Sequence, residues 1–403
     1  MPLSQSLRQQ IDRCVMCGIC SQHCPTYTLS PDENESPRGR LALIAAVNEE
    51  RLAVTPPLLA HLDHCLGCRA CERACPSQVA FGEIMDQARG LLESHRPRQQ
   101  RLHKRIGHAL LGHRRILRSA FTSLRWLQKS GLGKAAKALP PIPASPAWQT
   151  YYPPVGEARG EVGLFLGCIN ETLGQTELRA TIQLLTRTGH GVHVPPQQTC
   201  CGALHRHNGN LRAADGLARR NLRAFEKLPI TAILHTASGC TSTLREYGQH
   251  GQSGDTPLPA AAAFGARVQD ASHFLARLPW RGEMTFSPLP RRVAIHSPCS
   301  LKNVLRQAEA PFRLLKNIPD IELLALADNG LCCGGAGGYL LSQPERAARL
   351  REDKLDALHD ARAEILVTSN IGCALHLQAG LRERGRDIEV LHPLTLLARQ
   401  VGG

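Results

Sequence analysis

The second half of the chain alternates short apolar runs with longer amphipathic segments. The runs are short, rich in β-forming residues and each followed by a cysteine, and they are typical of strands buried in a parallel sheet. They are EVGLFLGC at 161–168, HGVHVPPQQTCC at 190–201, TAILHTASGC at 231–240, RRVAIHSPC at 291–299, IELLALADNGLCC at 321–333 and AEILVTSNIGC at 363–373. Segments 176–189, 210–228 and 344–361 have helical periodicity and charged faces. This alternation predicts small α/β units with parallel strands.

The α/β half is also a repeat. Each half of the repeat contains one cysteine, an adjacent cysteine pair followed by glycine, and a further cysteine. The first set is Cys168, Cys200, Cys201 and Cys240, and the second is Cys299, Cys332, Cys333 and Cys373. Corresponding cysteines are offset by 131, 132, 132 and 133 residues, and ILHTASGC in one copy matches ILVTSNIGC in the other. We therefore expect two homologous domains, at 159–285 and 286–403.

Every cysteine of the repeat follows a predicted strand. Ligands of open parallel sheets bind beyond the carboxyl ends of the strands, so the four thiols of each copy are expected to converge there. They could hold a metal or cluster, form a redox dithiol through the adjacent pair, or be small buried residues, and the duplication makes inert packing the weakest of these. Glycines after the second pair would let the backbone pass close to an inorganic ligand; they are Gly334, Gly335, Gly337 and Gly338.

The first part of the chain contains two copies of C-x2-C-x2-C-x3-C-P, at residues 14–25 and 65–76. This is the ligand pattern of bacterial ferredoxins, in which the fourth cysteine of each run binds the other cluster. The pattern predicts a helical and loop domain over 1–92 with two [4Fe-4S] clusters and an electron-transfer role. One cluster would be bound by Cys14, Cys17, Cys20 and Cys75, and the other by Cys65, Cys68, Cys71 and Cys24.

Zinc and disulfides are the alternatives for these cysteines. A structural zinc site uses two separated pairs and gives no reason for a third cysteine and a fourth followed by proline. The chain starts MPLSQSLRQQ, without an apolar stretch or a cleavage site, so we expect a reducing, cytoplasmic location in which sixteen cysteines serve metal ligation.

The formal net charge of +14 is concentrated in one segment. Residues 95–137 hold twelve Lys and Arg and no Asp or Glu, with apolar residues at helical spacing. We expect a basic amphipathic helix or helix pair, followed by a Pro-rich linker, over 93–158. Such an arm can lie on an anionic membrane surface, dock on an acidic partner or pack on its own chain. Nucleic acid is disfavoured because only Phe121 and Trp126 interleave with the charges.

Length and hydropathy restrict the architecture further. A chain of 403 residues exceeds one ordinary core, and its best apolar run, LALIAAV at 41–47, is too short to span a bilayer. Any membrane contact is therefore expected to be peripheral. We find no dinucleotide fingerprint and no nucleophile with a paired base, so substrate oxidation is expected on another polypeptide.

Two ferredoxin motifs followed by two CCG repeats resemble the iron-sulfur subunits of glycolate oxidase, in a wider family with lactate-oxidising, anaerobic glycerol-3-phosphate dehydrogenase and heterodisulfide reductase subunits. Four further sequence segments are also similar to this family: SPRGR at 36–40, TASGC at 236–240, REYGQ at 245–249 and NIGC at 370–373. The resemblance implies an electron-transfer subunit that accepts electrons from an FAD-containing dehydrogenase subunit oxidising a 2-hydroxy acid, with glycolate favoured, and passes them toward membrane quinone. It also implies a peripheral position on the inner face of the cytoplasmic membrane.

The chain departs from the full heterodisulfide reductase pattern at one point in each repeat. That pattern ends in C-x2-C, whereas Thr243 and His376 stand at the second position here. Four thiolates per repeat suffice for an ordinary cluster, so one or two further clusters are expected in the CCG repeats. His207 and His376 are either ligands, proton carriers or polar packing residues. A disulfide-reducing catalytic subunit and a non-catalytic assembly protein are the remaining alternatives.

Overall fold

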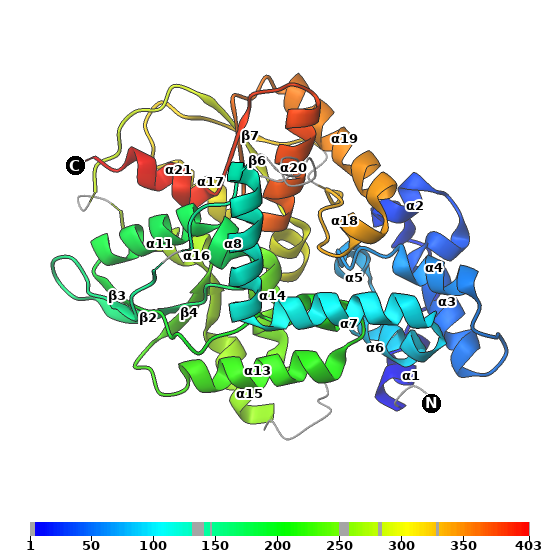
Figure 1. The fold of residues 1–403 in the computed structure, drawn as a ribbon. Coiled ribbons are helices and arrows are strands. Elements are labelled where there is room, and N and C mark those ends of the chain that lie inside the picture. The colour runs from blue at the N-terminus through cyan, green and yellow to red at the C-terminus, as the bar shows by residue number, and fades with distance from the viewer. Residues whose placement is uncertain are drawn as a thin grey trace.

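The computed structural model of the protein describes residues 5–130, 141–145, 147–249, 258–280, 284–327 and 330–402. The N-terminal region, blue to cyan in Figure 1, is built from helices and loops, and two sheets follow in the rest of the chain. Among the described helices, none combines the length and the apolar character that crossing a bilayer requires.

The N-terminal helices enclose a small core of their own. Their bounds are α1 Gln5–Asp12, η1 Ser21–His23, α2 Pro25–Leu29, η2 Glu33–Glu35, α3 Pro37–Asn48, α4 Pro56–Asp63, α5 Ala70–Ala74, α6 Phe81–Leu92 and η3 Glu93–His95. The Ser36 and Thr55 side chains cap α3 and α4, each of which begins with proline. The core residues include Leu7, Leu41, Ile44, Leu62, Ile84 and Met85.

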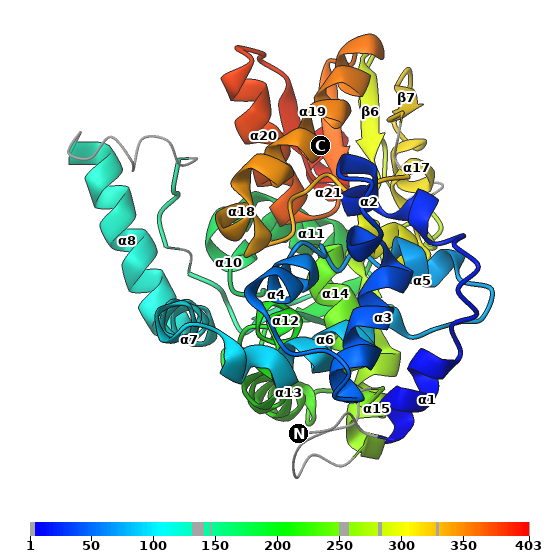
Figure 2. The same cartoon turned by 90° about the vertical axis from the view of Figure 1, so that its right-hand side faces the viewer.

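Two basic helices follow, α7 (Arg98–Gly112) and α8 (Arg114–Ser130). They cross at a large angle, and Figure 2 shows α8 leaning along the outer edge of the molecule. The described part of the predicted arm is therefore a helix pair.

The first sheet has the strand order β1-β3-β2-β4-β5. Its strands are β1 Tyr151–Tyr152, β2 Gly160–Leu164, β3 His190–His193, β4 Ala232–His235 and β5 Val268–Asp270. All neighbours pair in parallel except β1 with β3. The accompanying helices are α10 Asn170–Leu173, α11 Gln175–Arg187, α12 Ala203–His207, α13 Leu211–Phe225, α14 Ser238–Arg245, η4 Glu246–Gly248, α15 Leu258–Arg267 and α16 Ala271–Leu275.

The second sheet has the order β7-β6-β8-β9 and is parallel throughout. Its strands are β6 Arg292–His296, β7 Glu322–Ala325, β8 Ile365–Thr368 and β9 Glu389–Leu391. The helical elements are η5 Ser300–Val304, α17 Ala310–Leu315, α18 Tyr339–Ser342, α19 Pro344–Asp360, α20 Ile371–Glu383 and α21 Pro393–Gln400.

The predicted fold class is confirmed, and so are the parallel strands of both repeats. Three strands were not predicted. Strand β1 lies inside the segment we expected to be an extended linker, where Tyr151 and Tyr152 add an antiparallel edge to the first sheet. Strands β5 and β9 have only three residues each, too few to show a periodic pattern.

The two sheets share one apolar core. Buried residues from β2, α11 and β3 form a single cluster with residues from β6, α17 and α21. Helix α21, at the end of the chain, packs against α11 of the first repeat. This shared core holds the carboxyl ends of the two sheets in a constant relative position.

Candidate iron-sulfur centres

The cysteines of the two N-terminal motifs lie on tight loops. Met16 and Gly18 in the first loop have φ of 56° and 83°, and Gly67 and Arg69 in the second have 64° and 56°. The φ of Gly18 is one that residues with side chains rarely adopt, and a Cβ there would also lie 2.7 Å from Nη1 of Arg38, so the guanidinium would have to move. These left-handed turns reverse the backbone within each C-x2-C-x2-C run and keep its three cysteines close together.

One of the predicted ligand sets lines a single cavity. Cys24 of the first motif faces Cys65, Cys68 and Cys71 of the second around about 300 Å³ of empty space, part of it open to solvent. The structure therefore brings together the crossed set that the motif predicts. Burial raises the pKa of Cys71 well above its ordinary value, and repulsion from Cys68 adds to this effect. Thiols in this setting lose their protons only when a metal cation binds to the sulfur.

The other predicted set is more open. Cys14 and Cys20 interact electrostatically, and burial, more than that interaction, raises the pKa of Cys20. Cys75 follows α5, which packs against η1 directly after Cys20. Cys17 is exposed on its loop. The structure thus places Cys14, Cys20 and Cys75 around one region and leaves Cys17 at its solvent side.

The SPRGR text places a buried guanidinium beside Cys24. Arg40 is 1% exposed, directs Nη1 at the Cys24 Sγ 3.8 Å away, and pairs with Glu35 at 2.8 Å. Nδ1 atoms of His61 and His64 lie 2.8 and 2.6 Å from Oε1 of the same carboxylate. Burial alone would raise the pKa of Glu35, but these histidines and Arg40 outweigh it and lower the pKa to about 2. A permanent positive charge therefore faces a thiolate of this set.

The four cysteines of the first repeat lie close enough to influence one another's pKa values. Cys168 follows β2, the Cys200–Cys201 pair precedes α12, and Cys240 lies in α14 after β4. Hydrogen bonding between Cys168 and Cys200, with burial, raises the pKa of Cys168 well above its ordinary value. The interaction with Cys201 first, and the nearby imidazole of His235 after it, lower the pKa of Cys240 to about 6 against the raising effect of burial.

The second repeat brings its four cysteines together in the same way. Sγ of Cys332 lies 3.9 Å from Sγ of Cys299, and Cys333 interacts with Cys332 and Cys373. A Cβ on Gly335 would be 3.3 Å from the Cys333 sulfur, so the glycine run does bring the backbone close to the thiols. The convergence expected at the carboxyl ends of the strands is present in both sheets.

The ferredoxin-like cavity adjoins the second repeat. The charge of Cys299 contributes to the raised pKa of Cys68, after burial, and Cys68 in turn acts on Cys332. Asn303 donates a hydrogen bond to the Cys68 carbonyl oxygen at 2.9 Å, and Arg73 donates one to the Lys302 carbonyl oxygen at 3.1 Å. Two cysteine sets far apart in sequence are therefore neighbours.

The two repeats also meet at their cysteine-bearing elements. Oγ of Ser238, which begins α14, lies 2.7 Å from Oγ of Ser300, which begins η5. Glu246 of the REYGQ text forms an ion pair with Arg69, the residue after Cys68. The cysteine set that contains Cys68 and the sets of the two CCG repeats are thus connected through short elements.

Sequence reasoning missed two histidines that lie at these sets. His235 ends β4 and His296 ends β6, and they are 0% and 1% exposed. Nε2 of each is buried without a hydrogen-bond partner. The only signal in the sequence was their position, as the last residue of an apolar run that leads to a cysteine.

The histidines that we singled out from the sequence have other contacts. Nδ1 of His207 lies 3.2 Å from Oδ1 of Asp86 in α6. Nε2 of His376 donates to the Ala347 carbonyl oxygen in α19 at 3.1 Å. Thr243, at the other C-x2-C position, donates its hydroxyl to Gly239.

The donor set suits iron-sulfur clusters. The structure describes all sixteen cysteines, and none of them forms a disulfide. Sulfur ligands in groups of four, with backbone N–H groups such as that of Gly202 at 3.4 Å from Cys200 Sγ, are what such clusters require. The residues present therefore fit this cofactor class.

Comparisons with known proteins agree with this geometry. Residues 10–79 match the family model described as a 4Fe-4S dicluster domain, and residues 162–245 and 293–378 match the cysteine-rich CCG domain. The chain is 32% identical to the probable glycolate oxidase iron-sulfur subunit of Bacillus subtilis, over 96% of this chain and 94% of the relative. It is 33% identical to the glycolate oxidase iron-sulfur subunit of Escherichia coli, over 94% and 92%.

A solved structure shares the fold. The crystal structure of a hypothetical protein from Helicobacter pylori superposes with a TM-score of 0.54 at 8% identity, and the match covers 100% of this chain and 73% of the other. At this identity the likeness concerns the fold alone.

Proposed function

Because the chain belongs to the family of glycolate oxidase iron-sulfur subunits, we propose that it takes electrons from an FAD-containing subunit that oxidises glycolate and delivers them toward membrane quinone. Glycolate loses two electrons and two protons to become glyoxylate, and a quinone gains the same number to become a quinol. Substrate chemistry belongs to the partner, and this chain supplies the route between donor and acceptor.

The proposed ligand sets follow the motifs. Cys14, Cys17, Cys20 and Cys75 hold one [4Fe-4S] cluster, and Cys24, Cys65, Cys68 and Cys71 hold the second. The CCG sets Cys168, Cys200, Cys201, Cys240 and Cys299, Cys332, Cys333, Cys373 hold one or two further clusters. Each cluster, when bound, accepts and releases one electron with little rearrangement. The division into 1–92, 93–158, 159–285 and 286–403 is part of this proposal.

The packing of the Cys68 loop against the element that follows Cys299, joined by the Asn303 hydrogen bond, is the observation that supports this function best. Electron transfer needs redox centres that lie close to one another, and adjacent loops that each carry a proposed ligand bring two such centres together. Arg40 neutralises charge at Cys24, and the Asn303 and Arg73 hydrogen bonds hold the two loops together. These residues position the proposed centres and take no part in bond chemistry.

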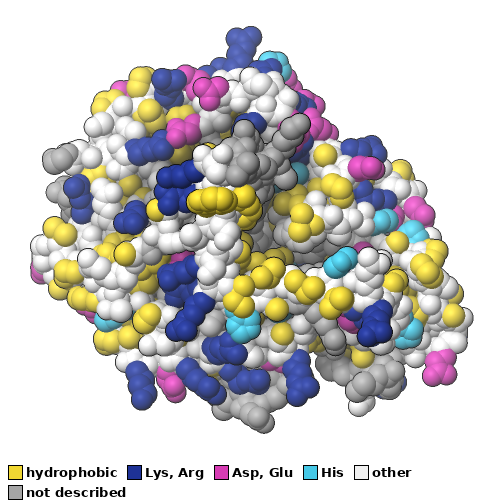
Figure 3. All heavy atoms as spheres, viewed as in Figure 1, with side chains coloured by type: hydrophobic (Ala, Val, Ile, Leu, Met, Phe, Trp, Pro, Cys, Tyr) yellow, Lys and Arg dark blue, Asp and Glu magenta, His cyan; other side chains and the backbone are white. Residues whose placement is uncertain are grey.

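Peripheral attachment to an anionic membrane surface is the second part of the proposal. Helix α7 turns its buried His108 toward His205 of α12 and leaves Leu102 and Ile106 outside, 54% and 52% exposed. Figure 3 looks onto this face and shows hydrophobic side chains over α7 with Lys and Arg side chains beside α8. Apolar side chains next to basic ones suit the boundary between lipid headgroups and acyl chains.

Two measurements test the proposed function: the iron and sulfide content, and electron transfer to an artificial acceptor. Iron and sulfide are measured in the full chain purified anaerobically: about twelve to sixteen irons are expected, about eight would leave the CCG sets empty, and none would remove the electron-transfer role. Cys17→Ser and Cys68→Ser are expected to abolish reduction of an artificial acceptor while glycolate still reduces the partner flavin. Ser21→Ala, in the same loop region, is the control. Undiminished transfer in both cysteine variants would contradict the proposal.

A further inference from the structure

One histidine stands at the carboxyl end of the central strand pair in each sheet. In the first repeat it is His235 on β4, beside Phe165 after β2. In the second it is His296 on β6, which is paired in register with Thr368 on β8. Offsets of 131 and 133 residues make His296 the counterpart of Phe165 and Thr368 the counterpart of His235. The imidazole has changed strands between the repeats but has kept its place in the sheet.

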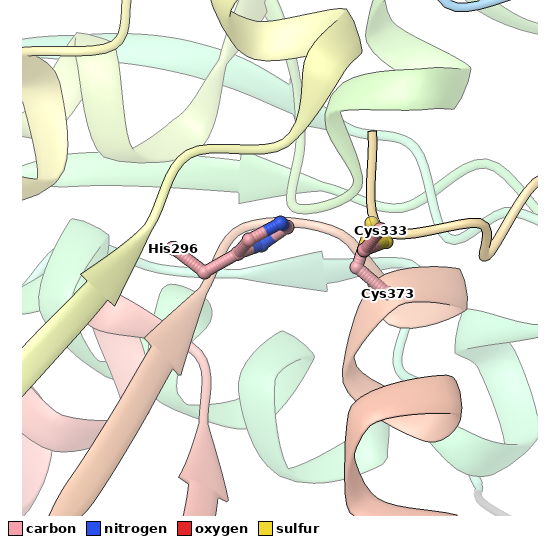
Figure 4. Close-up of side chains that lie close together, drawn as sticks. All are labelled: His296, Cys333 and Cys373. Carbon is pink, nitrogen blue, oxygen red and sulfur yellow. The ribbon is translucent and has the colours of Figure 1, made fainter. Parts of the chain in front are cut away.

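His296 points at two of the cysteines of its repeat. Figure 4 shows its ring directed from the end of β6 toward Cys333 and Cys373. One ligand atom of each of these residues lies within 4.8 Å of the others, and all three residues are buried. Nδ1 lies 2.9 Å from Oγ1 of Thr368, which orients the ring, and Nε2 has no hydrogen-bond partner.

His235 is also oriented by a backbone contact, and this contact determines its tautomer. Its Nδ1 lies 2.6 Å from the carbonyl oxygen of Phe165, and a carbonyl can only accept, so Nδ1 carries the proton. Nε2 then has a free lone pair, is buried without a partner, and belongs to a ring that acts on Cys240. A metal-binding histidine is typically fixed in this way, with its second nitrogen donating to a carbonyl.

A buried ring nitrogen without a hydrogen-bond partner destabilises the fold, so two such atoms at equivalent sites call for a ligand. An imidazole nitrogen that carries no proton is the form that binds metal ions.

We propose that Nε2 of His296 and Nε2 of His235 bind iron in the two CCG sets, supplying the fifth ligand that Thr243 and His376 do not. The inference rests on the proposed function only in requiring that the CCG sets hold iron. A neutral nitrogen in place of a fifth thiolate makes each centre one charge less negative. Nitrogen ligation raises cluster potentials, which favours electron flow from the ferredoxin-like clusters into the CCG domains.

Nitrogen hyperfine spectroscopy tests the ligation directly. The full chain is prepared anaerobically with 15N-histidine and with natural histidine, reduced stepwise, and studied by pulsed electron paramagnetic resonance. A strong coupling that changes from the 14N to the 15N pattern is expected in the CCG signals. His296→Ala and His235→Ala should each remove one coupling, whereas His376→Ala, the matched buried histidine of α20, should leave both.

Each outcome is decisive without relying on the variants to fold. Twelve or more irons with no histidine coupling in the unaltered protein would overturn the ligation and leave the electron-transfer role intact. About eight irons would overturn the loading of the CCG sets and the ligation with it. His296→Cys should keep the iron content while one nitrogen coupling disappears; a coupling that persists in this variant would assign it to another histidine.

Discussion

Asn303 donates a hydrogen bond through Nδ2 to the backbone carbonyl oxygen of Cys68, over 2.9 Å. Asn303 belongs to the second repeat and Cys68 to the second ferredoxin-like motif, 235 residues earlier in the chain. The bond holds the loop of a proposed cluster ligand against the element that follows Cys299. This side-chain amide therefore helps to set the distance between two proposed redox centres.

Replacing Asn303 by Ala should loosen this junction. We expect a loss of about 1 kcal/mol in stability, because one hydrogen bond to a backbone carbonyl is removed. Electron transfer from the ferredoxin-like clusters to the CCG clusters should slow several-fold. Freeze-quench electron paramagnetic resonance, which follows the signal of each cluster, measures the rate. Asn317→Ala is the control, because Asn317 bonds only to nearby carbonyls of its own helix. Equal transfer rates in the two variants would argue against a positioning role.

Glu35→Gln should destabilise the N-terminal domain strongly. The substitution leaves Arg40 buried without its carboxylate, and breaking a buried pair in this way costs about 3–5 kcal/mol. Glu33→Gln removes a carboxylate that is 50% exposed and pairs with Arg38, so its cost should stay within about 1 kcal/mol. Denaturant unfolding of both anaerobic proteins, followed by cluster absorbance, measures the difference. Similar midpoints would mean that the Arg40 charge is already neutralised by another group.

Asp270 should make stability depend on pH near neutrality. Burial raises its pKa to about 7, although its carboxylate accepts backbone N–H groups of Ser272 and His273 and faces His235. Since the folded-state pKa lies above the ordinary 3.8, stability is greatest below that value and falls as pH rises toward about 7.

Asp270→Asn keeps the cap but cannot ionise, so it should remove this dependence. Between pH 5 and pH 8 the variant should gain stability relative to the parent, on the order of 2–4 kcal/mol. Denaturant unfolding at both pH values measures it. If the free energy of unfolding changes with pH in the same way in both proteins, the pKa of Asp270 is not raised in the folded state and the prediction is wrong.

Leu102→Asp with Ile106→Asp should weaken binding to anionic vesicles at least tenfold. Both side chains are more than half exposed on α7, and charged groups there oppose insertion into the headgroup boundary. Flotation with phosphatidylserine vesicles measures binding, with phosphatidylcholine vesicles for comparison. Val155→Asp is the control, since Val155 is 62% exposed but lies outside α7 and α8. Binding that the helix variants do not change would point to a partner subunit on this surface.

The strands and cofactor class could be predicted from the sequence because their causes are local. A run such as VAIH can be stable only where both faces of a strand are buried, and it became β6. Strand β1 could not be predicted, because two tyrosines form a strand only when β3 is beside them. Similarly, the apolar spacing of α7 showed an amphipathic helix but not that Leu102 and Ile106 would remain outside.

The sequence by itself determined which thiolates exist, how they are spaced, and that the CCG unit occurs twice, because ligand spacing and repetition are properties of the chain. Only the tertiary structure decided that Cys68 lies beside Cys299 and that unpaired imidazoles of His235 and His296 face the cysteines. Cys68 and Cys299 are 231 positions apart, and His296 and Cys373 are 77 positions apart. These relationships arise when sheets and helices pack around a common core, which no local pattern describes.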